Sequence, residues 1–309
     1  MRQFLQGKDV TLGVTGGIAA YKSVELLRLL SKAGARVRVI MTDNARWFVG
    51  PGTFQALSGQ PVCTSVFEEG DAAIRHIDWA QSTDLAVIAP ATANCIGKLA
   101  GGIADDALST YMLAVTAPVV ICPAMNTNMY QHTSVQRNLD ILRGDGHFLI
   151  EPHAGELACG TEGPGRLPAP EFIMDKLAAV MAPNDRAGRS VLVTAGPTRE
   201  AIDPVRFISN PSSGKMGFAI ADAARQRGAS VILVSGPVDL PDPIDVDVHR
   251  VTSAREMHDC VMGLMDDVDI VIKTAAVSDY RPVSPASHKI KKTADQMTLA
   301  LEKTQDILR

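Results

Sequence analysis

The sequence predicts an α/β protein with two successive domains, and three observations support this prediction. Short apolar runs rich in β-branched residues alternate with segments of helical periodicity, which is typical of a doubly wound parallel sheet. A polar stretch interrupts this pattern, and the pattern then restarts. The chain also has 309 residues, which is more than a single domain usually contains.

The first domain is expected to span residues 1–182 and to open with a strand, a glycine-rich turn and a helix closed by Gly34. Its strands are expected at 10–14, 37–41, 85–89 and 119–122, and its helices at 23–34 and 172–181. Residues 148–170 are rich in Gly and Pro, so we expect a long functional loop there.

The polar residues 183–189 are expected to form a linker to a second domain, 190–309, which repeats the strand–turn–helix opening. Its strands are expected at 190–195, 231–235 and 270–274, and its helices at 217–228 and 254–265. The fold class is therefore a flavodoxin-like or Rossmann-like α/β domain followed by a second Rossmann-like α/β domain.

Composition argues against several classes of protein. A net charge of −4 and 5% aromatic residues do not favour a nucleic-acid binder. The five cysteines show no zinc-type or CxxC spacing, which indicates reduced thiols. The most apolar stretch, 112–125, contains two prolines and is shorter than the ~18 residues of a membrane span. We therefore expect a soluble, cytoplasmic protein.

The first glycine-rich turn, TGGIAAYK, places backbone N–H groups at a helix N-terminus, where a phosphate could bind. An ordinary strand-to-helix turn would look the same. The positions of Gly13, Gly16 and Gly17 do not make GxGxxG, and the second strand ends at Thr42 rather than at an acidic residue. The turn therefore favours a mononucleotide over NAD.

Further polar residues follow the apolar strands, and each has a simpler explanation when taken alone. Thr92 could be only a helix cap, and Ser109 has a similar status. A single histidine such as His76 is more often structural or solvated than catalytic. Cys159 alone would more often be a buried structural thiol. Together with Asn126, however, they supply an imidazole, a thiol and an amide to one α/β fold.

Several motifs of the first half, in this order, closely resemble the phosphopantothenoylcysteine decarboxylase domain, one of the homo-oligomeric flavin-containing cysteine decarboxylases. They are GVTGGIAAYK, RHIDWA, APATAN, PAMNTNMY and ACGTEGPGR. In the second half, VTAGPTREAIDPVRFISNPSSGKMG, AAVSDYRP and KIKK resemble the phosphopantothenate–cysteine ligase domain that is fused to it in bacteria. The resemblance covers essentially the whole chain and implies a bifunctional enzyme of coenzyme A biosynthesis.

For the first half, the resemblance implies that FMN oxidises the thiol of phosphopantothenoylcysteine, so that CO2 leaves. Reduced flavin and an acid then return hydride and proton, and 4′-phosphopantetheine forms. It implies that His76 acts as base and orienting group, that Asn126 holds the substrate carboxylate, and that Cys159 donates a proton. The FMN-binding residues that it implies are Gly16, Gly17, Thr42, Thr92, Asn94 and Ser109. Some of these contacts are expected to come from a neighbouring subunit.

For the second half, the resemblance implies that CTP activates 4′-phosphopantothenate as an acyl-cytidylate and that the amine of cysteine then displaces CMP. Asn210 is expected to bind the acyl-cytidylate and Lys289 to contact the phosphates. The cluster that contains Lys289 could otherwise be a solvated cationic run. The implied CTP contacts are Thr274, Ala275, Ala276, Asp279 and Lys289. Mg²⁺ is expected mainly on the CTP phosphates, with Asp279 as its candidate protein ligand.

The resemblance also implies a homo-oligomer built from trimers of the decarboxylase domain, up to a dodecamer, with dimer contacts through the ligase domain. No nucleic acid or membrane is expected as a partner. The chain stops at KTQDILR, whereas bacterial fusions continue with more sheet and further nucleotide contacts. We therefore expect a complete decarboxylase half and a C-terminally incomplete ligase half, whose activity is in question.

Two other functions fit parts of the sequence. An NAD(P)-dependent oxidoreductase would fit the two Rossmann-like openings, but neither of them contains GxGxxG. A regulatory flavoprotein without catalytic activity would share the first fold, but the joint presence of His76, Asn126 and Cys159 argues against it. Peptidyl-cysteine decarboxylases and flavin prenyltransferases share that fold too, but not the fused second half.

Overall fold

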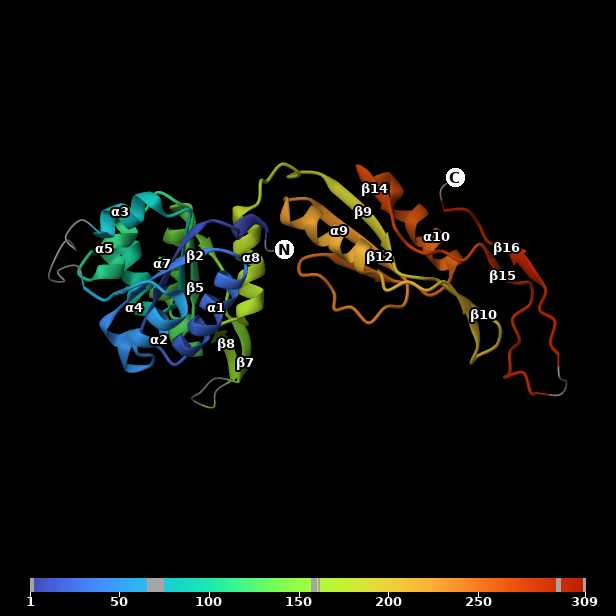
Figure 1. Ribbon diagram of the computed structural model, residues 1–309, viewed down its shortest axis with the longest axis horizontal. Helices are drawn as coiled ribbons and strands as arrows, with labels where there is room; N and C mark the ends of the chain where they lie inside the picture. Colours follow the sequence, from blue (N-terminus) through green and yellow to red (C-terminus); the bar gives the residue numbers. More distant parts are fainter. Residues whose placement is uncertain (1–2, 66–74, 157–159, 161, 293–295, 308–309) are drawn as a thin grey trace. The chain divides into compact units, whose positions relative to one another are not determined.

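The computed structural model describes residues 3–65, 75–156, 160, 162–292 and 296–307 (Figure 1). The described residues divide into two compact units, with the boundary between residues 181 and 182. Each unit has its own sheet and its own buried core. None of the described helices is long and apolar enough to cross a membrane.

The first unit contains a six-stranded parallel sheet in the order β3-β2-β1-β4-β5-β6. The strands are β1 (Asp9–Val14), β2 (Arg36–Met41), β3 (Val62–Cys63), β4 (Leu85–Ala91), β5 (Val119–Pro123) and β6 (Phe148–Leu149). The four strands expected from the apolar runs are confirmed, each within a residue or two. This order reverses direction between β1 and β4, which is the doubly wound arrangement of a Rossmann-like sheet.

Helices cover both faces of this sheet because the central strands are apolar on both sides. Residues of β4 alternate between two cores: Val87 packs with the core of α1, whereas Ile88 packs with that of α5. One face carries α1 (Ala20–Lys32), α2 (Pro51–Ser58) and α8 (Pro170–Met181), and the other carries α3 (Arg75–Ser82), α4 (Ala93–Gly101), α5 (Ala107–Ala114) and α7 (Thr133–Gly144). This layering confirms the expected α/β class.

The expectation of a long loop at 148–170 is wrong, because this stretch contains strands. After β6, an antiparallel hairpin forms from β7 (His153–Glu156) and β8 (Glu162–Arg166). The hairpin strands contain glycines and charged residues, so they do not show the apolar periodicity by which strands are predicted. At Gly165 the backbone has φ +143°, and a Cβ there would overlap the carbonyl oxygen of Met125. Glycine therefore lets the hairpin lie directly against the segment that follows β5.

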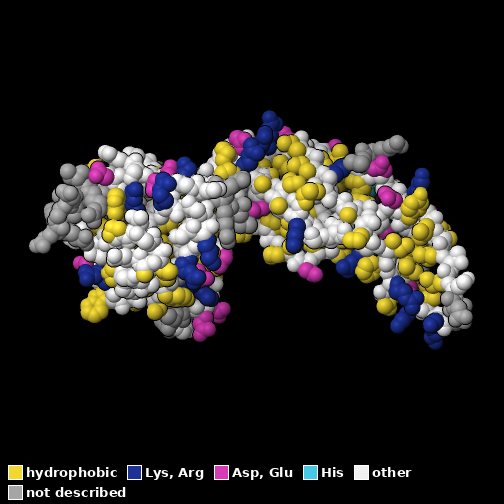
Figure 2. Space-filling view, in the orientation of Figure 1, with side chains coloured by type: hydrophobic (Ala, Val, Ile, Leu, Met, Phe, Trp, Pro, Cys, Tyr) yellow, Lys and Arg dark blue, Asp and Glu magenta, His cyan; other side chains and the backbone are white. Residues whose placement is uncertain are grey.

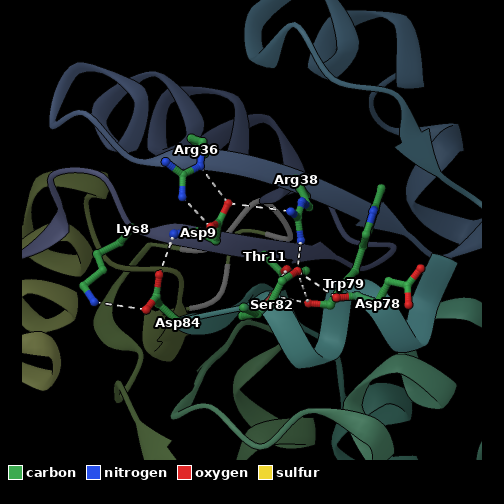
Figure 3. A network of polar contacts seen from close by, with 10 residues as sticks. Lys8, Asp9, Thr11, Arg36, Arg38, Asp78, Trp79, Ser82 and Asp84 are labelled. Atoms are coloured by element: carbon green, nitrogen blue, oxygen red, sulfur yellow. Dashed lines mark hydrogen bonds and ion pairs between the residues drawn. The ribbon is translucent and has the colours of Figure 1, made fainter.

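A polar network joins the amino-terminal ends of the central strands β1 and β2 to the residue that precedes β4 (Figure 3). Asp9 accepts hydrogen bonds from the guanidinium of Arg36, and its backbone N–H donates to Asp84 (2.9 Å). Arg38 donates to Ser82 (2.7 Å) at the C-terminal end of α3 and lies over the ring of Trp79 at 5.6 Å. These contacts attach α3 to β1 and β2.

The second unit contains a four-stranded parallel sheet in the order β13-β12-β9-β14. Its strands are β9 (Ser190–Ala195), β12 (Ser230–Ser235), β13 (Asp247–Arg250) and β14 (Ile270–Lys273). The helices α9 (Lys215–Gln226) and α10 (Ala254–Leu264) pack on opposite faces. Two short antiparallel pairs complete the unit: β10 (Arg199–Ala201) with β11 (Phe207–Ser209), and β15 (Tyr280–Pro282) with β16 (Leu301–Lys303).

Candidate functional site

The first unit has a cleft of about 860 Å³ at the carboxyl ends of β1, β4 and β5. This is where a doubly wound sheet reverses its strand order, the usual place for a ligand in such folds. The turn after β1, the loops after β4 and β5, and the hairpin β7–β8 all contribute. The lining residues are Gly16, Gly17, Ile18, Ala19, Tyr21, Lys22, Thr92, Ala93, Ala124, Met125, Asn126, Met129, Glu156, Gly160, Gly165, Arg166 and Leu167.

A buried threonine, which sequence reasoning missed, holds two of these loops together. The hydroxyl of Thr15 donates to the carbonyl of Pro90 (2.7 Å) and accepts the N–H of Thr92 (3.1 Å). Thr92 in turn caps α4, since its hydroxyl accepts the N–H of Cys95 (3.4 Å). Thr92 therefore serves as the simple helix cap that its sequence allowed and also lines the cleft.

The glycine-rich turn lies close to the segment after β2. A Cβ at Gly16 would overlap Asn44, so only glycine allows this approach. Thr42 stands at the end of β2 with its N–H bonded to the carbonyl of Val14 (3.1 Å). The structure therefore brings Gly16, Gly17 and Thr42 to the same edge of the sheet, although Thr42 does not line the cleft.

Two of the expected FMN contacts, Asn94 and Ser109, do not line the cleft. Asn94 is exposed in the first turn of α4 and does not line the cleft. Ser109 is buried in α5, where its N–H donates to the carboxylate of Asp106 (2.8 Å) and its hydroxyl oxygen accepts the N–H of Asp106 (3.1 Å). This reciprocal arrangement caps α5. The roles of Asn94 and Ser109 in FMN binding remain predictions.

Asn126 lies in the cleft at the N-terminus of α6 (Thr127–Tyr130). Its Oδ1 accepts the N–H of Asn128 (2.9 Å). This bond fixes which end of the side-chain amide is the oxygen and which is the Nδ2 donor. The backbone on either side is also fixed. Met125 donates to the carbonyl of Gly165 (3.0 Å), and Tyr130 donates to that of Asn126 (2.9 Å).

The far end of α6 is anchored by a second polar group. The hydroxyl of Tyr130 donates to Glu151, which also accepts a hydrogen bond from Arg143. Burial and the neighbouring Glu151 carboxylate together raise the pKa of Tyr130 to about 12. Tyr130 therefore stays protonated at neutral pH and keeps donating to Glu151, which helps to hold the segment that carries Asn126.

For the other two catalytic candidates, His76 and Cys159, the structure does not describe the side chains. His76 lies in the first turn of α3, and its side chain is outside the described part of the structure. Cys159 also lies outside the described residues, between Glu156 and Gly160, which line the cleft. In Figure 1, α3 is on the opposite side of the first unit from the hairpin β7–β8. A single chain thus does not bring α3 to the cleft that contains Asn126.

Two basic residues of the cleft were not singled out from the sequence. The ammonium of Lys22 donates to the carbonyl of Leu167 (2.5 Å), next to Arg166. Burial lowers the pKa of Lys22, and the positive charge of Arg166 lowers it further. Both residues lie inside motifs that the sequence analysis quoted, so a basic residue flanking a glycine-rich segment was the available signal.

The second unit has a cleft of about 650 Å³ beside the carboxyl ends of β9 and β14. It is lined by Thr194, Lys273, Ala275, Val277, Ser278, Asp279, Tyr280, Lys303, Thr304, Gln305, Asp306 and Ile307. Ala275 and Asp279, two of the expected CTP contacts, are in this set. The neighbouring Thr274 and Ala276 are tied to the strand β9 and its following turn by bonds to Thr194 (2.6 Å) and Gly196 (2.8 Å).

Asn210 is exposed and does not line this cleft. Its Nδ2 donates to the carbonyl of Val277 (3.0 Å), and Ser209 donates to that of Thr198 (2.7 Å). The structure therefore brings Asn210 next to the segment that carries Ala275 and Asp279.

Lys289 is exposed and does not line the cleft, but the next residue is held firmly. The buried Asp203 accepts the N–H groups of Val205 and Arg206 (2.8 Å each) and that of Ile290 (3.1 Å). Arg206 donates to the carbonyl of Ile290 (3.2 Å). Burial alone would raise the pKa of Asp203, but these N–H donors lower it below its ordinary value.

Metal ligands are sparse in the described ranges. No group of three or more His, Cys, Asp or Glu side chains there is arranged to hold a metal ion. Asp279 and Asp306 are the carboxylates that line the second cleft, and both are exposed.

Comparison with known proteins assigns each half of the chain to a family. Residues 2–182 match the family described as Flavoprotein, and residues 186–309 match the DNA/pantothenate metabolism flavoprotein C-terminal domain. The chain is 53% identical over 310 residues to the coenzyme A biosynthesis bifunctional protein CoaBC of Bacillus subtilis (strain 168), covering 99% of this chain and 76% of that protein. It is 48% identical over 309 residues to the protein of the same name from Escherichia coli (strain K12), covering 98% and 76%.

Two solved structures are similar to the first unit. One is a PPC decarboxylase mutant complexed with pantothenoylaminoethenethiol, with a TM-score of 0.50 and 30% identity over 56% of this chain and 97% of that chain. The other is MrsD from a Bacillus species, with a TM-score of 0.51 and 27% identity over 58% of this chain and 99% of that chain.

Proposed function

Because this chain belongs to the CoaBC family of bifunctional coenzyme A biosynthesis proteins, we propose that its first unit decarboxylates 4′-phosphopantothenoylcysteine to 4′-phosphopantetheine with FMN as cofactor. The observation that carries this proposal is the cleft at the β1/β4 reversal with the oriented amide of Asn126 inside it. A related PPC decarboxylase mutant has been solved in complex with pantothenoylaminoethenethiol, which supports a substrate of this class.

The residues around this cleft fit a flavin mononucleotide. Its volume of about 860 Å³ is in the range of cofactor sites. The turn at Gly16 and Gly17 has no side chains to keep a ligand away from the N-terminus of α1. Gly16, Gly17, Thr42 and Thr92 are the residues that we expect to hold the cofactor. When bound, it would take two electrons from the substrate thiol and return them after CO2 has left, so that the product is again a thiol.

The roles of the protein side chains follow from their chemistry. The Nδ2 of Asn126 donates to the substrate carboxylate and orients it before CO2 leaves. Cys159 then donates a proton to the carbon that has lost CO2, and His76 accepts the proton of the thiol. The hairpin β7–β8 contributes Glu156, Gly165 and Arg166 to the lining of the cleft and limits the access of water in this proposal.

The placement of α3 supports an oligomeric active site. Since α3 and the hairpin β7–β8 lie on opposite sides of the first unit, His76 of one chain meets the Asn126 cleft of another in our proposal (Figure 1). We propose an assembly built from trimers, up to a dodecamer, with further dimer contacts through the second unit. The cytoplasm is the proposed location, in keeping with the four cysteines of the described residues, Cys63, Cys95, Cys122 and Cys260, which form no disulfide.

For the second unit, we propose CTP-dependent ligation of 4′-phosphopantothenate with cysteine through an acyl-cytidylate. CTP is proposed to bind Thr274, Ala275, Ala276 and Asp279, with Mg²⁺ on its phosphates. Ala275 and Asp279 line the second cleft, and Asn210 bonds to the same segment, which supports this proposal. Lys289 is proposed to reach the phosphates from the segment that Asp203 holds.

The first test is the absorption spectrum of the purified protein, followed by CO2 release from 4′-phosphopantothenoylcysteine. We expect bound FMN, CO2 release, and loss of that release in Asn126→Ala with FMN retained. Asn128→Ala is the matched control, since Asn128 contributes only its backbone N–H to Asn126. A protein that refuses FMN would refute the decarboxylase proposal.

The ligase proposal is tested separately with CTP, 4′-phosphopantothenate and cysteine. Active protein releases pyrophosphate when the acyl-cytidylate forms and CMP when cysteine attacks. Asn210→Ala is expected to release pyrophosphate and accumulate the acyl-cytidylate without CMP. Absence of pyrophosphate release from the unaltered chain would reject the ligase activity for this chain and leave the decarboxylase proposal untouched.

A further inference from the structure

Two cations stand together in the first cleft. Lys22 belongs to the first turn of α1, and Arg166 is the last residue of β8. The ammonium of Lys22 donates to the carbonyl of Leu167, the residue that follows Arg166 (2.5 Å). This bond joins α1 to the end of the hairpin and places both positive charges on the cleft wall.

Neither cation has a carboxylate partner in the ranges that the structure describes. Within those ranges, the ammonium of Lys22 forms one hydrogen bond, to the carbonyl of Leu167, and Arg166 forms no ion pair. Glu25 acts on Lys22 only through space. Burial and the charge of Arg166 lower the pKa of Lys22, so the charged pair is unfavourable without an anion.

We propose that Lys22 and Arg166 form a binding site for a phosphate monoester, an inference that rests on the proposed function and specifies how this cleft holds a phosphorylated ligand. A phosphate monoester carries about −1.5 to −2 charge at pH 7, which balances two cations where a carboxylate would balance only one. The planar guanidinium of Arg166 can bind two phosphate oxygens at once.

The N-terminus of α1 faces the same ligand space. Ala19 occupies its N-cap position and makes no side-chain hydrogen bond to the first turn of the helix. Ile18 and Ala19 line the cleft together with Lys22. The backbone N–H groups and the dipole of α1 therefore add to the positive potential that the two cations create in this part of the cleft.

The proposed reaction offers two phosphate monoesters, that of FMN and that of 4′-phosphopantothenoylcysteine. The experiment uses Lys22→Gln, which keeps a donor for the carbonyl of Leu167, and Arg166→Gln. Lys32→Gln removes an exposed charge from the other end of α1 and is the control. Dissociation constants of FMN and riboflavin are measured by flavin fluorescence on flavin-free protein. Values of kcat/KM are measured with 4′-phosphopantothenoylcysteine and pantothenoylcysteine at saturating FMN.

Loss of one charge-assisted contact corresponds to roughly a tenfold loss of preference for the phosphorylated ligand. If the site holds the cofactor phosphate, Lys22→Gln and Arg166→Gln each lower the FMN-to-riboflavin preference about tenfold. If it holds the substrate phosphate, the preference for 4′-phosphopantothenoylcysteine falls instead, and FMN affinity is unchanged. Both preferences unchanged, or an equal change in Lys32→Gln, would overturn the proposal.

A last measurement separates this proposal from the proposed function. If the protein neither binds flavin nor releases CO2, inorganic phosphate is titrated into the unaltered protein and the Lys22→Gln/Arg166→Gln double variant, with phosphorus NMR as the readout. A binding event lost in the double variant supports the phosphate site on its own. Identical titrations reject it.

Discussion

Tyr111→Phe is expected to destabilise the first unit by about 1–2 kcal/mol. Tyr111 is fully buried, and its hydroxyl bonds to Thr11 (2.8 Å) and Thr83 (2.7 Å). Phenylalanine removes one oxygen atom and leaves the ring packing intact. Each neutral hydrogen bond contributes about 1 kcal/mol net. The loss stays at the low end of the full burial penalty, because Thr11 and Thr83 still bond to each other (2.8 Å).

The assay is urea or thermal unfolding followed by tryptophan fluorescence. The chain has two tryptophans, Trp47 and Trp79, and both lie in the first unit, so the signal reports that unit alone. For a unit of this size, 1 kcal/mol corresponds to about 2–4 °C in Tm, which predicts a shift of about 2–8 °C.

Tyr21→Phe is the matched control, because Tyr21 is 59% exposed and its hydroxyl forms no hydrogen bond within the described residues. Its unfolding curve should coincide with that of the unaltered chain. Equal stability of Tyr111→Phe and Tyr21→Phe would refute the reasoning, since it would mean that the buried hydroxyl contributes nothing. A double variant with Thr11→Val should lose less than the sum of the two single losses, because the two changes remove a shared bond.

Three further predictions follow from the structure. The N–H of Asp9 holds the pKa of Asp84 below its ordinary value, so the stabilising effect of this carboxylate is complete above the ordinary pKa of an aspartate and is lost as the pH falls through the lowered pKa. Asp84→Asn should therefore lower the urea midpoint at pH 7 and flatten the decline of that midpoint in acid. Gly165→Ala should abolish CO2 release, whereas Gly144→Ala, with open space around it, should not. Asp203→Asn should slow pyrophosphate release at the second unit and leave CO2 release unchanged; equal rates would contradict its role as the residue that holds the Lys289 segment.

The sheet could be predicted from the sequence because its strands are buried on both faces. A run such as 85–89 has no polar residue, so its position is fixed by composition alone. The hairpin β7–β8 could not be predicted in this way. Its strands are held by glycine conformations and by contacts with α6, and neither leaves an apolar period in the sequence.

The candidate site was only partly predictable, because sequence order places a residue after a strand but does not give the direction of its side chain. Thr92 and Asn94 are two residues apart, yet Thr92 lines the cleft and Asn94 points to solvent. Ser109 is used by the cap of α5, and the Asp-x-x-Ser spacing that reveals this was present in the sequence. Lys22 and Arg166 are far apart in the chain, so only the fold could bring them together.

In both clefts, a threonine hydroxyl at the end of one strand accepts backbone N–H groups of the loop that follows the neighbouring strand. In the first unit, the hydroxyl of Thr15 accepts the N–H of Thr92 across the sheet. In the second, the hydroxyl of Thr194 accepts the N–H groups of Thr274 and Ala275 (3.2 and 3.3 Å). Each threonine fixes the spacing of the two loops that a ligand at the strand reversal must touch. The scaffold is therefore common to both units, and selectivity depends on what surrounds it: the cationic hairpin end in the first and the carboxylates and lysines of 273–306 in the second.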